Sequence, residues 1–220
     1  MPSPKAVLFD FDGVIADTEN VHVAAWERVF ARMGLDVSPD QCVRSAEIDD
    51  RDFLTKILAS KKIEEGAVEG WVGRKQELTE MMLKDQPSLY PGVVELIQRL
   101  EGRASLGIVS TARRADIELV LKAGGIAGAF AVIVAKEDVS ATKPDPESYR
   151  TALELLAVSR EEVVAIEDSA TGLSAAESAG VRCLAVGHKH ANRVWAGDSL
   201  FLEDLADTGA VLAVLGFEDV

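Results

Sequence analysis

Short apolar runs that recur along the chain constrain its fold more than any other feature. They are rich in valine and isoleucine and do not alternate with polar residues, which is typical of parallel strands covered on both faces. The runs are AVLF (6–9), LGIV (106–109), AVIVA (131–135), VVAI (163–166) and CLAV (183–186). Together they predict a buried parallel sheet.

Helical patterns separate these runs, and glycines follow where helix C-caps are expected. The helical segments are 93–100, 115–124, 146–156 and 169–180, and the glycines are Gly124, Gly125 and Gly180. A strand and a helix that alternate in this way predict an α/β domain with a doubly wound parallel sheet.

One long segment interrupts the alternation. Between Thr18 and about Gln86 there is no convincing strand, but residues 21–33, 51–59 and 64–84 follow helical patterns. We therefore expect a smaller helical domain, residues 17–87, to be inserted after the first strand of a core domain. The core domain is predicted to cover residues 1–16 and 88–220.

The charge of the chain limits its partners. Its 220 residues are 48% hydrophobic, which is enough to bury a full core, and its formal net charge is −14. Like charge repels nucleic acid and anionic membranes, so neither is expected as a partner. An anionic substrate would need a local cation, such as a metal ion or a few lysines.

The cysteines and the N-terminus indicate the compartment. Cys42 and Cys183 do not form a disulfide framework, which favours a reducing environment. The N-terminus, MPSPKAVLFDFD, reaches charged residues before a signal-peptide core could form, and no apolar run approaches the ~20 residues of a membrane span. We expect a cytoplasmic protein.

Polar residues follow the predicted strands at the ends where a ligand binds. In open α/β sheets the ligand crevice lies beyond the carboxyl ends of the strands. The residues expected there are Asp10, Asp12, Ser110, Thr111, Lys143 in ATKPDP, Glu167 and Asp168. Carboxylates that converge in one crevice repel each other unless a cation lies among them, and oxygen ligands suit Mg²⁺. We predict a Mg²⁺ site at this edge of the sheet.

These residue types support phosphoryl transfer. The Asp10 carboxylate can attack phosphorus to give an aspartyl-phosphate. Asp12 can protonate the leaving oxygen and later take a proton from water. Lys143 and Mg²⁺ would offset the charge of the phosphoryl group, whose oxygens the Ser110 hydroxyl and nearby backbone N–H groups would hold.

A structural role competes with each of these assignments. Ser110 can cap the following helix, Glu167 and Asp168 can form the N-terminal cap region of theirs, and a lysine such as Lys143 is common on surfaces. The order of these residues on successive strand ends favours a common site.

Four stretches of the chain together resemble one enzyme family. They are LFDFDGVIADTE, GIVST, ATKPDPE and VVAIEDSATGLSAAESAG, and the similarity covers nearly the whole chain. On these stretches the chain is identified as a member of the haloacid dehalogenase superfamily of phosphoryl-transfer enzymes. Its subgroup has a helical cap and includes β-phosphoglucomutase and many sugar-phosphate phosphatases. The resemblance implies a Rossmann-like core with a small α-helical cap.

The resemblance also implies a role for each acidic residue. Asp10 is implied to be the nucleophile and Asp12 the acid/base. Asp10, the Asp12 carbonyl and Asp168, with Glu167 nearby, are implied to hold Mg²⁺. The dehalogenases of the superfamily lack the second aspartate of the first motif, so Asp12 argues against dehalogenation.

The cap supplies further candidates for substrate binding. The segment DTENVHVAAW (17–26) resembles the start of the cap in β-phosphoglucomutase, which implies that Thr18 lies at the hinge and that His22 faces the site. Lys75 resembles a cap lysine that reaches toward substrate. A structural or exposed position explains His22 and Lys75 about as well. The other predicted substrate-binding residues follow the second strand and are Ser110, Thr111 and Arg113.

The first cap loop departs from the mutase. There, a glycine-containing loop presents an arginine that holds the second phosphate of the sugar. The match of SAEIDDRDFLTKIL (45–58) to that loop places Asp50 at the arginine position and Arg51 one residue later. This acidic segment would repel a second phosphate, although Arg51 or Lys75 could replace the missing arginine.

Three functions agree with these features. The first is a Mg²⁺-dependent phosphatase that hydrolyses a small phosphate monoester, such as a sugar phosphate, through an aspartyl-phosphate. The second is a phosphosugar mutase of the β-phosphoglucomutase type. The third is a receiver-type signalling module, which we disfavour because a receiver has its acceptor on a middle strand and has no helical insert.

Overall fold

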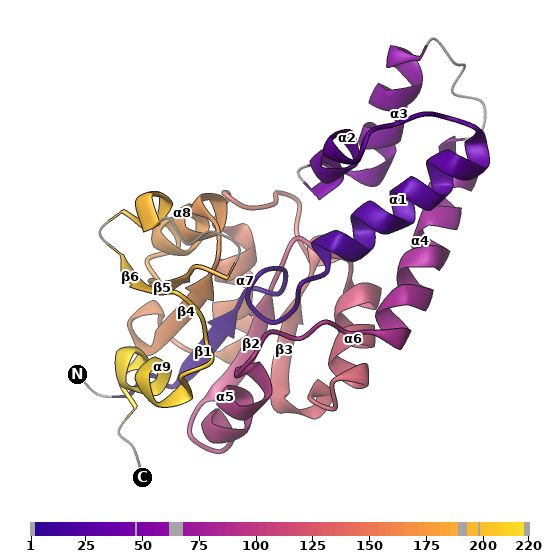
Figure 1. The fold of residues 1–220 in the computed structure, drawn as a ribbon. Coiled ribbons are helices and arrows are strands. Elements are labelled where there is room, and N and C mark those ends of the chain that lie inside the picture. The colour runs from indigo at the N-terminus through magenta and orange to yellow at the C-terminus, as the bar shows by residue number, and fades with distance from the viewer. Residues whose placement is uncertain (1–2, 47, 62–67, 189–192, 198, 218–220) are drawn as a thin grey trace. The chain divides into compact units, whose positions relative to one another are not determined.

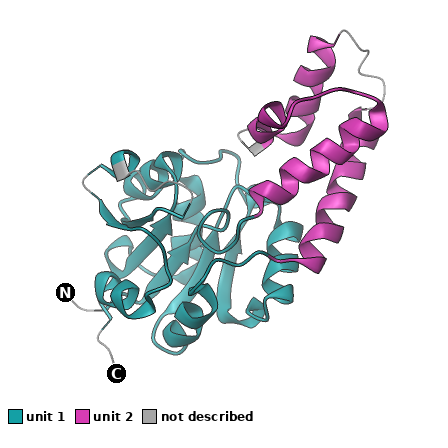
Figure 2. Ribbon diagram, in the orientation of Figure 1, with its two compact units in different colours: residues 1–17, 88–220 teal, residues 18–87 magenta. Residues whose placement is uncertain are grey.

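The computed structural model describes residues 3–46, 48–61, 68–188, 193–197 and 199–217. The chain divides into two compact units, which Figure 2 shows in different colours. Unit 1 comprises Met1–Asp17 and Ser88–Val220, and unit 2 comprises Thr18–Pro87. The predicted insert, residues 17–87, differs from this division by one residue. That unit 2 acts as a cap stays a prediction.

Unit 1 is built on a parallel sheet with the order β3-β2-β1-β4-β5-β6 (Figure 1). The strands are β1 (Ala6–Phe9), β2 (Ser105–Val109), β3 (Phe130–Val134), β4 (Val163–Glu167), β5 (Arg182–Val186) and β6 (Leu200–Leu202). The predicted doubly wound parallel sheet is confirmed. β6 was not predicted from the sequence.

Helices cover both faces of this sheet. α7 (Glu147–Leu156) and α8 (Ala170–Ser178) lie on one face, and α5 (Val93–Leu100), α6 (Arg114–Ala123) and α9 (Thr208–Leu215) lie on the other (Figure 1). This arrangement is the one that right-handed crossovers produce when the strand order reverses beside β1. Short 3₁₀ helices complete the unit: η2 (Ala127–Ala129), η3 (Lys136–Asp138), η4 (Arg160–Glu162) and η5 (Arg193–Ala196).

The core on the α7 and α8 face shows why these runs form buried strands. Alternate residues of the strands, such as Ala6 and Leu8 of β1, pack there against Tyr149 and Ala152 of α7. The other residues of β1, Val7 and Phe9, are also fully buried. A strand with both faces covered in this way needs apolar residues without alternation.

Unit 2 is entirely helical within the residues that the structure describes. Its elements are α1 (Glu19–Met33), α2 (Pro39–Val43), η1 (Arg44–Ala46), α3 (Asp50–Ser60) and α4 (Val68–Asp85). The helix predicted over 64–84 is observed from Val68, and residues 64–67 lie outside the described ranges. Its core holds stacked rings of Trp26 and Phe30, with centroids 5.3 Å apart, and the edge of Phe53.

Within the described ranges, none of the helices combines the length and the apolar character that crossing a bilayer requires.

Candidate active site

The central strand of the sheet ends at the first predicted catalytic residue. β1 pairs with β2 on one side and with β4 on the other. Asp10 follows β1 directly, and its backbone N–H donates to the Ile166 carbonyl of β4 (2.9 Å). Because the order of strands reverses at this point, a crevice is expected between the carboxyl ends of β1 and β4. Glu167 is the last residue of β4, so it lies at the same edge of the sheet as Asp10.

Three acidic side chains come together there. Asp10, Glu167 and Asp168 each offer a carboxylate oxygen, and these oxygens lie within 4.8 Å of one another. The three residues are buried, with exposures of 8%, 0% and 6%. The side chain of Asp12 is not part of this group among the described residues. If Asp12 holds a metal, its backbone carbonyl is therefore the better candidate.

Lys143 binds two of these carboxylates. Its Nζ donates to Asp10 Oδ1 (2.8 Å), to Glu167 Oε1 (2.6 Å) and to the Val109 carbonyl of β2 (2.8 Å). Burial by itself would lower the pKa of Lys143, but the charges of Asp10 and Glu167 raise it above its ordinary value. The amine therefore stays protonated at neutral pH, beside the predicted nucleophile.

Tyr149 is a member of this site that sequence reasoning missed. It lies on α7, is fully buried, and donates its hydroxyl to Glu167 Oε1 (2.5 Å). Burial, followed by the charge of Glu167, raises the pKa of Tyr149, so the phenol remains a donor. The available signal was a tyrosine on the apolar face of a predicted helix, since a buried phenol usually finds a hydrogen-bond partner.

The donor set fits a divalent cation. One lysine, Lys143, faces three carboxylates. Burial, followed by the charge of Asp10, raises the pKa of Glu167 to about 8. Lys143 and Tyr149 act in the opposite direction and lower this pKa. The buried Oε2 of Glu167 has no hydrogen-bond partner among the described residues. A buried group of carboxylate oxygens of this kind suits Mg²⁺.

The loop after Asp10 requires a glycine. Gly13 has φ +85°, and a Cβ atom on it would lie 1.7 Å from Asp168 Oδ2. The close approach packs this backbone against the acidic group. His188 also reaches the loop: its Nδ1 lies 3.2 Å from the Gly13 carbonyl, and its Nε2 accepts from the Leu205 N–H (3.1 Å), which implies that Nδ1 carries the proton. Sequence reasoning missed His188, and no sequence pattern marks it.

Gly13→Ala is expected to destabilise the protein more than Gly102→Ala. Both glycines have positive φ, so an alanine costs about 1–2 kcal/mol at either position. Nothing lies within 4 Å of the added atom at Gly102, whereas at Gly13 it overlaps Asp168 and adds about 1–3 kcal/mol. Urea unfolding of both variants measures the difference. Equal losses would contradict the close packing of Gly13 against Asp168.

The residues predicted after the second strand lie in different environments. Ser110 is buried (2% exposed), and its Oγ accepts from the Ala112 N–H (3.0 Å) in the loop; it does not cap α6, whose N-cap residue is Arg113. Thr111 is exposed. Arg113 is the N-cap residue of α6, and its guanidinium lies 3.8 Å from Asp116 Oδ1. Substrate binding by these three residues stays a prediction.

The cap candidates gather within unit 2. Lys75 on α4 is buried, and its Nζ lies 2.7 Å from His22 Nδ1 on α1. The same ammonium pairs with both oxygens of Asp50, at 2.8 and 2.9 Å. Trp26 Nε1 donates to Asp50 Oδ1 (3.2 Å). Asp50, which the resemblance places at the position of the mutase arginine, is thus the counterion of Lys75.

The remaining cap candidates make other contacts. Thr18 is buried (1% exposed), and its carbonyl accepts from the N–H groups of Val21 and His22 at the start of α1. Arg51, the other candidate cation, pairs with Glu69 (3.0 Å), and both side chains are exposed.

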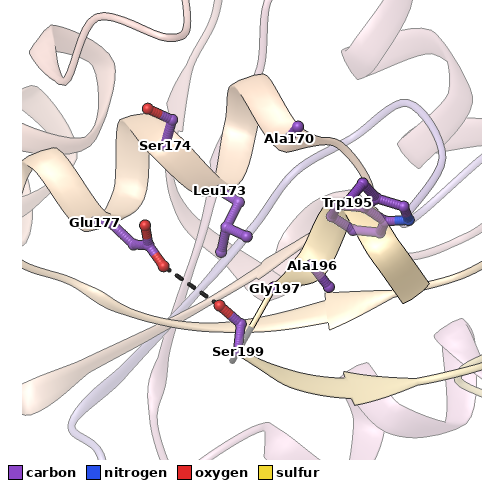
Figure 3. A pocket seen from close by; sticks show the side chains of 8 residues that line it. All are labelled: Ala170, Leu173, Ser174, Glu177, Trp195, Ala196, Gly197 and Ser199. Atoms are coloured by element: carbon purple, nitrogen blue, oxygen red, sulfur yellow. Dashed lines mark hydrogen bonds between the residues drawn. The ribbon is translucent and has the colours of Figure 1, made fainter.

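A hollow of about 520 Å³ in unit 1 contains none of the predicted site residues (Figure 3). It is lined by α8, η5 and the segment before β6, including Leu173, Glu177, Trp195 and Ser199. Ser199 Oγ donates to Glu177 Oε1 across it (3.3 Å). The described residues that line it do not include the convergent charged groups of the acidic site, so we do not assign the chemistry to it.

Comparisons with known proteins show the family of this chain. The family model described as haloacid dehalogenase-like hydrolase matches residues 7–186. The chain is 33% identical over 179 residues to a phosphorylated carbohydrates phosphatase of Thermotoga maritima, covering 80% of this chain and 82% of the relative. It is 32% identical over 190 residues to β-phosphoglucomutase of Bacillus subtilis, covering 83% of each.

A longer relative and a solved structure extend the comparison. The chain spans 20% of the length of the chloroplastic protein SUPPRESSOR OF QUENCHING 1 of Arabidopsis thaliana, at 29% identity over 209 residues, or 92% of this chain. A crystal structure of a CbbY variant from Rhodobacter sphaeroides, in complex with xylulose-1,5-bisphosphate, superposes with a TM-score of 0.80. It is 28% identical and covers 93% of this chain and 96% of that one.

Proposed function

We propose that this chain, which belongs to the haloacid dehalogenase-like hydrolases and is a phosphoric monoester hydrolase, hydrolyses a small sugar monophosphate. The proposed reaction uses Mg²⁺ and passes through an aspartyl-phosphate on Asp10. The observation that carries this proposal is the buried group of Asp10, Glu167 and Asp168, with the Lys143 ammonium on the Asp10 carboxylate. A nucleophile, a cation that offsets phosphoryl charge and ligands for a metal are the groups that such a reaction needs.

The proposed reaction has two steps. In the first, a carboxylate oxygen of Asp10 attacks phosphorus, the bond to the sugar oxygen breaks, and Asp12 gives that oxygen its proton. In the second, the Asp12 carboxylate takes a proton from water, whose oxygen attacks the phosphorus of the aspartyl-phosphate and restores Asp10. Lys143 offsets the charge of the phosphoryl group in both steps. Bound Mg²⁺, held by Asp10, the Asp12 carbonyl and Asp168 with Glu167 nearby, would supply further positive charge.

The substrate is proposed to carry one phosphate. A second phosphate needs a fixed cation, and the resemblance assigns an arginine of the cap to that task. In this chain Asp50 has that position and neutralises Lys75, while Arg51 is paired with Glu69. Charge-assisted contacts contribute about 1.5–3 kcal/mol each, so the loss of the arginine weakens binding of a bisphosphate. This supports hydrolysis of a monophosphate over the xylulose bisphosphate of the CbbY complex.

A panel of phosphorylated metabolites tests the proposal. Incubated with Mg²⁺, the protein is expected to release inorganic phosphate from sugar monophosphates more efficiently than from xylulose 1,5-bisphosphate. The measurement is kcat/KM from phosphate release, with a chelator as the blank. Failure to release phosphate from every monophosphate, or a clear preference for the bisphosphate, would contradict it.

The sequence identity to β-phosphoglucomutase supports the alternative that the protein is a mutase. The reaction product distinguishes a mutase from a phosphatase. With β-glucose 1-phosphate and a bisphosphate activator, we expect phosphate release and little glucose 6-phosphate, because the bisphosphate intermediate of a mutase must stay bound while it reorients. Rapid isomerisation with negligible phosphate release would overturn the phosphatase proposal. Because Asp50 is the counterion of the buried Lys75, circular dichroism must first show that Asp50→Arg is folded; the folded variant is expected to bind sugar bisphosphates more tightly, whereas the matched change Asp52→Arg, two residues later in α3, should not alter binding.

Small phosphorylated metabolites are the proposed partners, and the cysteine content supports a cytoplasmic location. The formal charge of −14 supports the expectation that nucleic acid is not a partner.

A further inference from the structure

Tyr149 is placed to control one carboxylate of the acidic group. It lies six residues after Lys143, on α7. Its ring is part of the core between α7, α8 and the sheet. The ring also faces Lys143, whose Nζ lies 5.5 Å from the ring centroid. The hydroxyl is therefore directed at the site rather than at solvent, and its acceptor is Glu167 Oε1.

The two oxygens of Glu167 have different environments. Oε1 accepts from two donors, the Tyr149 hydroxyl (2.5 Å) and Lys143 Nζ (2.6 Å). Oε2 is buried and has no hydrogen-bond partner among the described residues. It packs against α8, since a Cβ atom on Gly172 would lie 1.9 Å from it. The donors on Oε1 and the helix backbone beside Oε2 together fix the rotation of the carboxylate.

These contacts leave one Glu167 oxygen without a hydrogen-bond donor among the described residues. Oε1 is engaged by two donors, so Oε2 is the oxygen with free acceptor capacity. Ca²⁺ takes six to eight ligands and often binds both oxygens of a carboxylate, whereas Mg²⁺ requires near-octahedral geometry with single oxygens. A carboxylate that is held to one available oxygen thus suits Mg²⁺ better than Ca²⁺.

We propose that Tyr149 is a positioning residue that restricts Glu167 to coordination through one oxygen, and that it thereby makes the site select Mg²⁺ over Ca²⁺. The inference rests on the proposed metal dependence. Tyr149 acts through Glu167 and does not touch the reacting atoms. Hydrogen-bonding partners of metal ligands typically change metal affinity by about 10-fold or more when they are removed.

Tyr149→Phe tests the proposal, because it removes one oxygen and keeps the ring in the core. Isothermal titration of the whole protein with Mg²⁺ and with Ca²⁺, without substrate, is expected to show Mg²⁺ affinity reduced about 10-fold. Ca²⁺ affinity is expected to stay the same or rise, so that the ratio of the two affinities falls. The control is Ser148→Ala, which removes a neighbouring buried hydroxyl that has no hydrogen-bond partner among the described residues. It should leave both affinities unchanged.

A double variant shows whether Tyr149 acts through Glu167. Glu167→Ala should itself lower the ratio of Mg²⁺ to Ca²⁺ affinity, and adding Tyr149→Phe should then change the ratio no further. Far-UV circular dichroism checks that each variant is folded. An unchanged ratio in folded Tyr149→Phe would overturn this inference alone, because the titration needs no turnover. Wild-type protein that binds no Mg²⁺ would overturn the metal proposal as well.

Discussion

Asp10→Asn is expected to abolish turnover while leaving the fold intact. The amide has the shape of the carboxylate and can still accept from Lys143 Nζ, but it cannot act as the nucleophile. Loss of a nucleophile of this kind lowers kcat by at least about 10³-fold. Phosphate release from the best sugar monophosphate measures the loss, and urea unfolding confirms that stability is retained.

A matched control separates this effect from a general change of charge. Asp207→Asn removes the same charge at the N-cap of α9, where its side chain accepts from the Ala210 N–H and asparagine caps equally well. It should keep full activity. Intact-protein mass spectrometry must exclude deamidated Asp10→Asn, which would restore the wild type. A variant free of such material that kept a tenth of the activity would contradict covalent catalysis by Asp10.

The strands of the central sheet could be predicted to within about one residue. The runs at 106–109 and 131–135 correspond to Ser105–Val109 and Phe130–Val134. Leu106–Val109 of β2 are buried, so burial imposes an unbroken apolar run that ends before the polar Ser110, whereas β3, at the edge of the sheet, is only partly buried. The same rule places Asp10 and Glu167 at one edge, because parallel strands end on the same side.

Elements without such a signal were missed. β6 has only three residues, Leu200–Leu202, and lies at the edge of the sheet. α9 (Thr208–Leu215) reads TGAVLAVL, which has no polar face and hence no helical period. α2 (Pro39–Val43) is one turn long, although its capping box of Ser38 and Gln41, with Pro39 at the first position, was readable.

The contacts of the site could not be predicted, because they join residues that are distant in sequence. The pairing of Lys75 with Asp50 depends on how α3 and α4 pack, and local sequence does not determine it. The bond from Tyr149 to Glu167 depends on how α7 packs on the sheet. The sequence indicated which residues carry charge at the site, but it did not indicate which of those charges neutralise each other.

Asp12→Ala is expected to be nearly as severe as Asp10→Asn on sugar phosphates, but to depend on the leaving group. General acid–base catalysis contributes about 10²–10⁴-fold, and a sugar alkoxide is a poor leaving group without a proton. Nitrophenolate leaves readily without one. With p-nitrophenyl phosphate, the first half-reaction of Asp12→Ala should therefore recover in part, while hydrolysis of the aspartyl-phosphate, which needs the base, stays slow.

Stopped-flow kinetics distinguishes these half-reactions. Asp12→Ala should release a burst of nitrophenolate close to one equivalent of enzyme, followed by slow turnover, and intact-protein mass spectrometry should detect the phosphorylated enzyme. Asp10→Asn is the control that should show no burst, since it lacks the nucleophile.

The backbone bridge between Asp12 and Ala16 does not involve the side chain, so the loop should keep its conformation in the alanine variant. If Asp12→Ala lost the same factor with nitrophenyl phosphate as with a sugar phosphate and showed no burst, Asp12 would not be the acid. The loss would then come from disturbance of the loop that also carries Gly13 against Asp168.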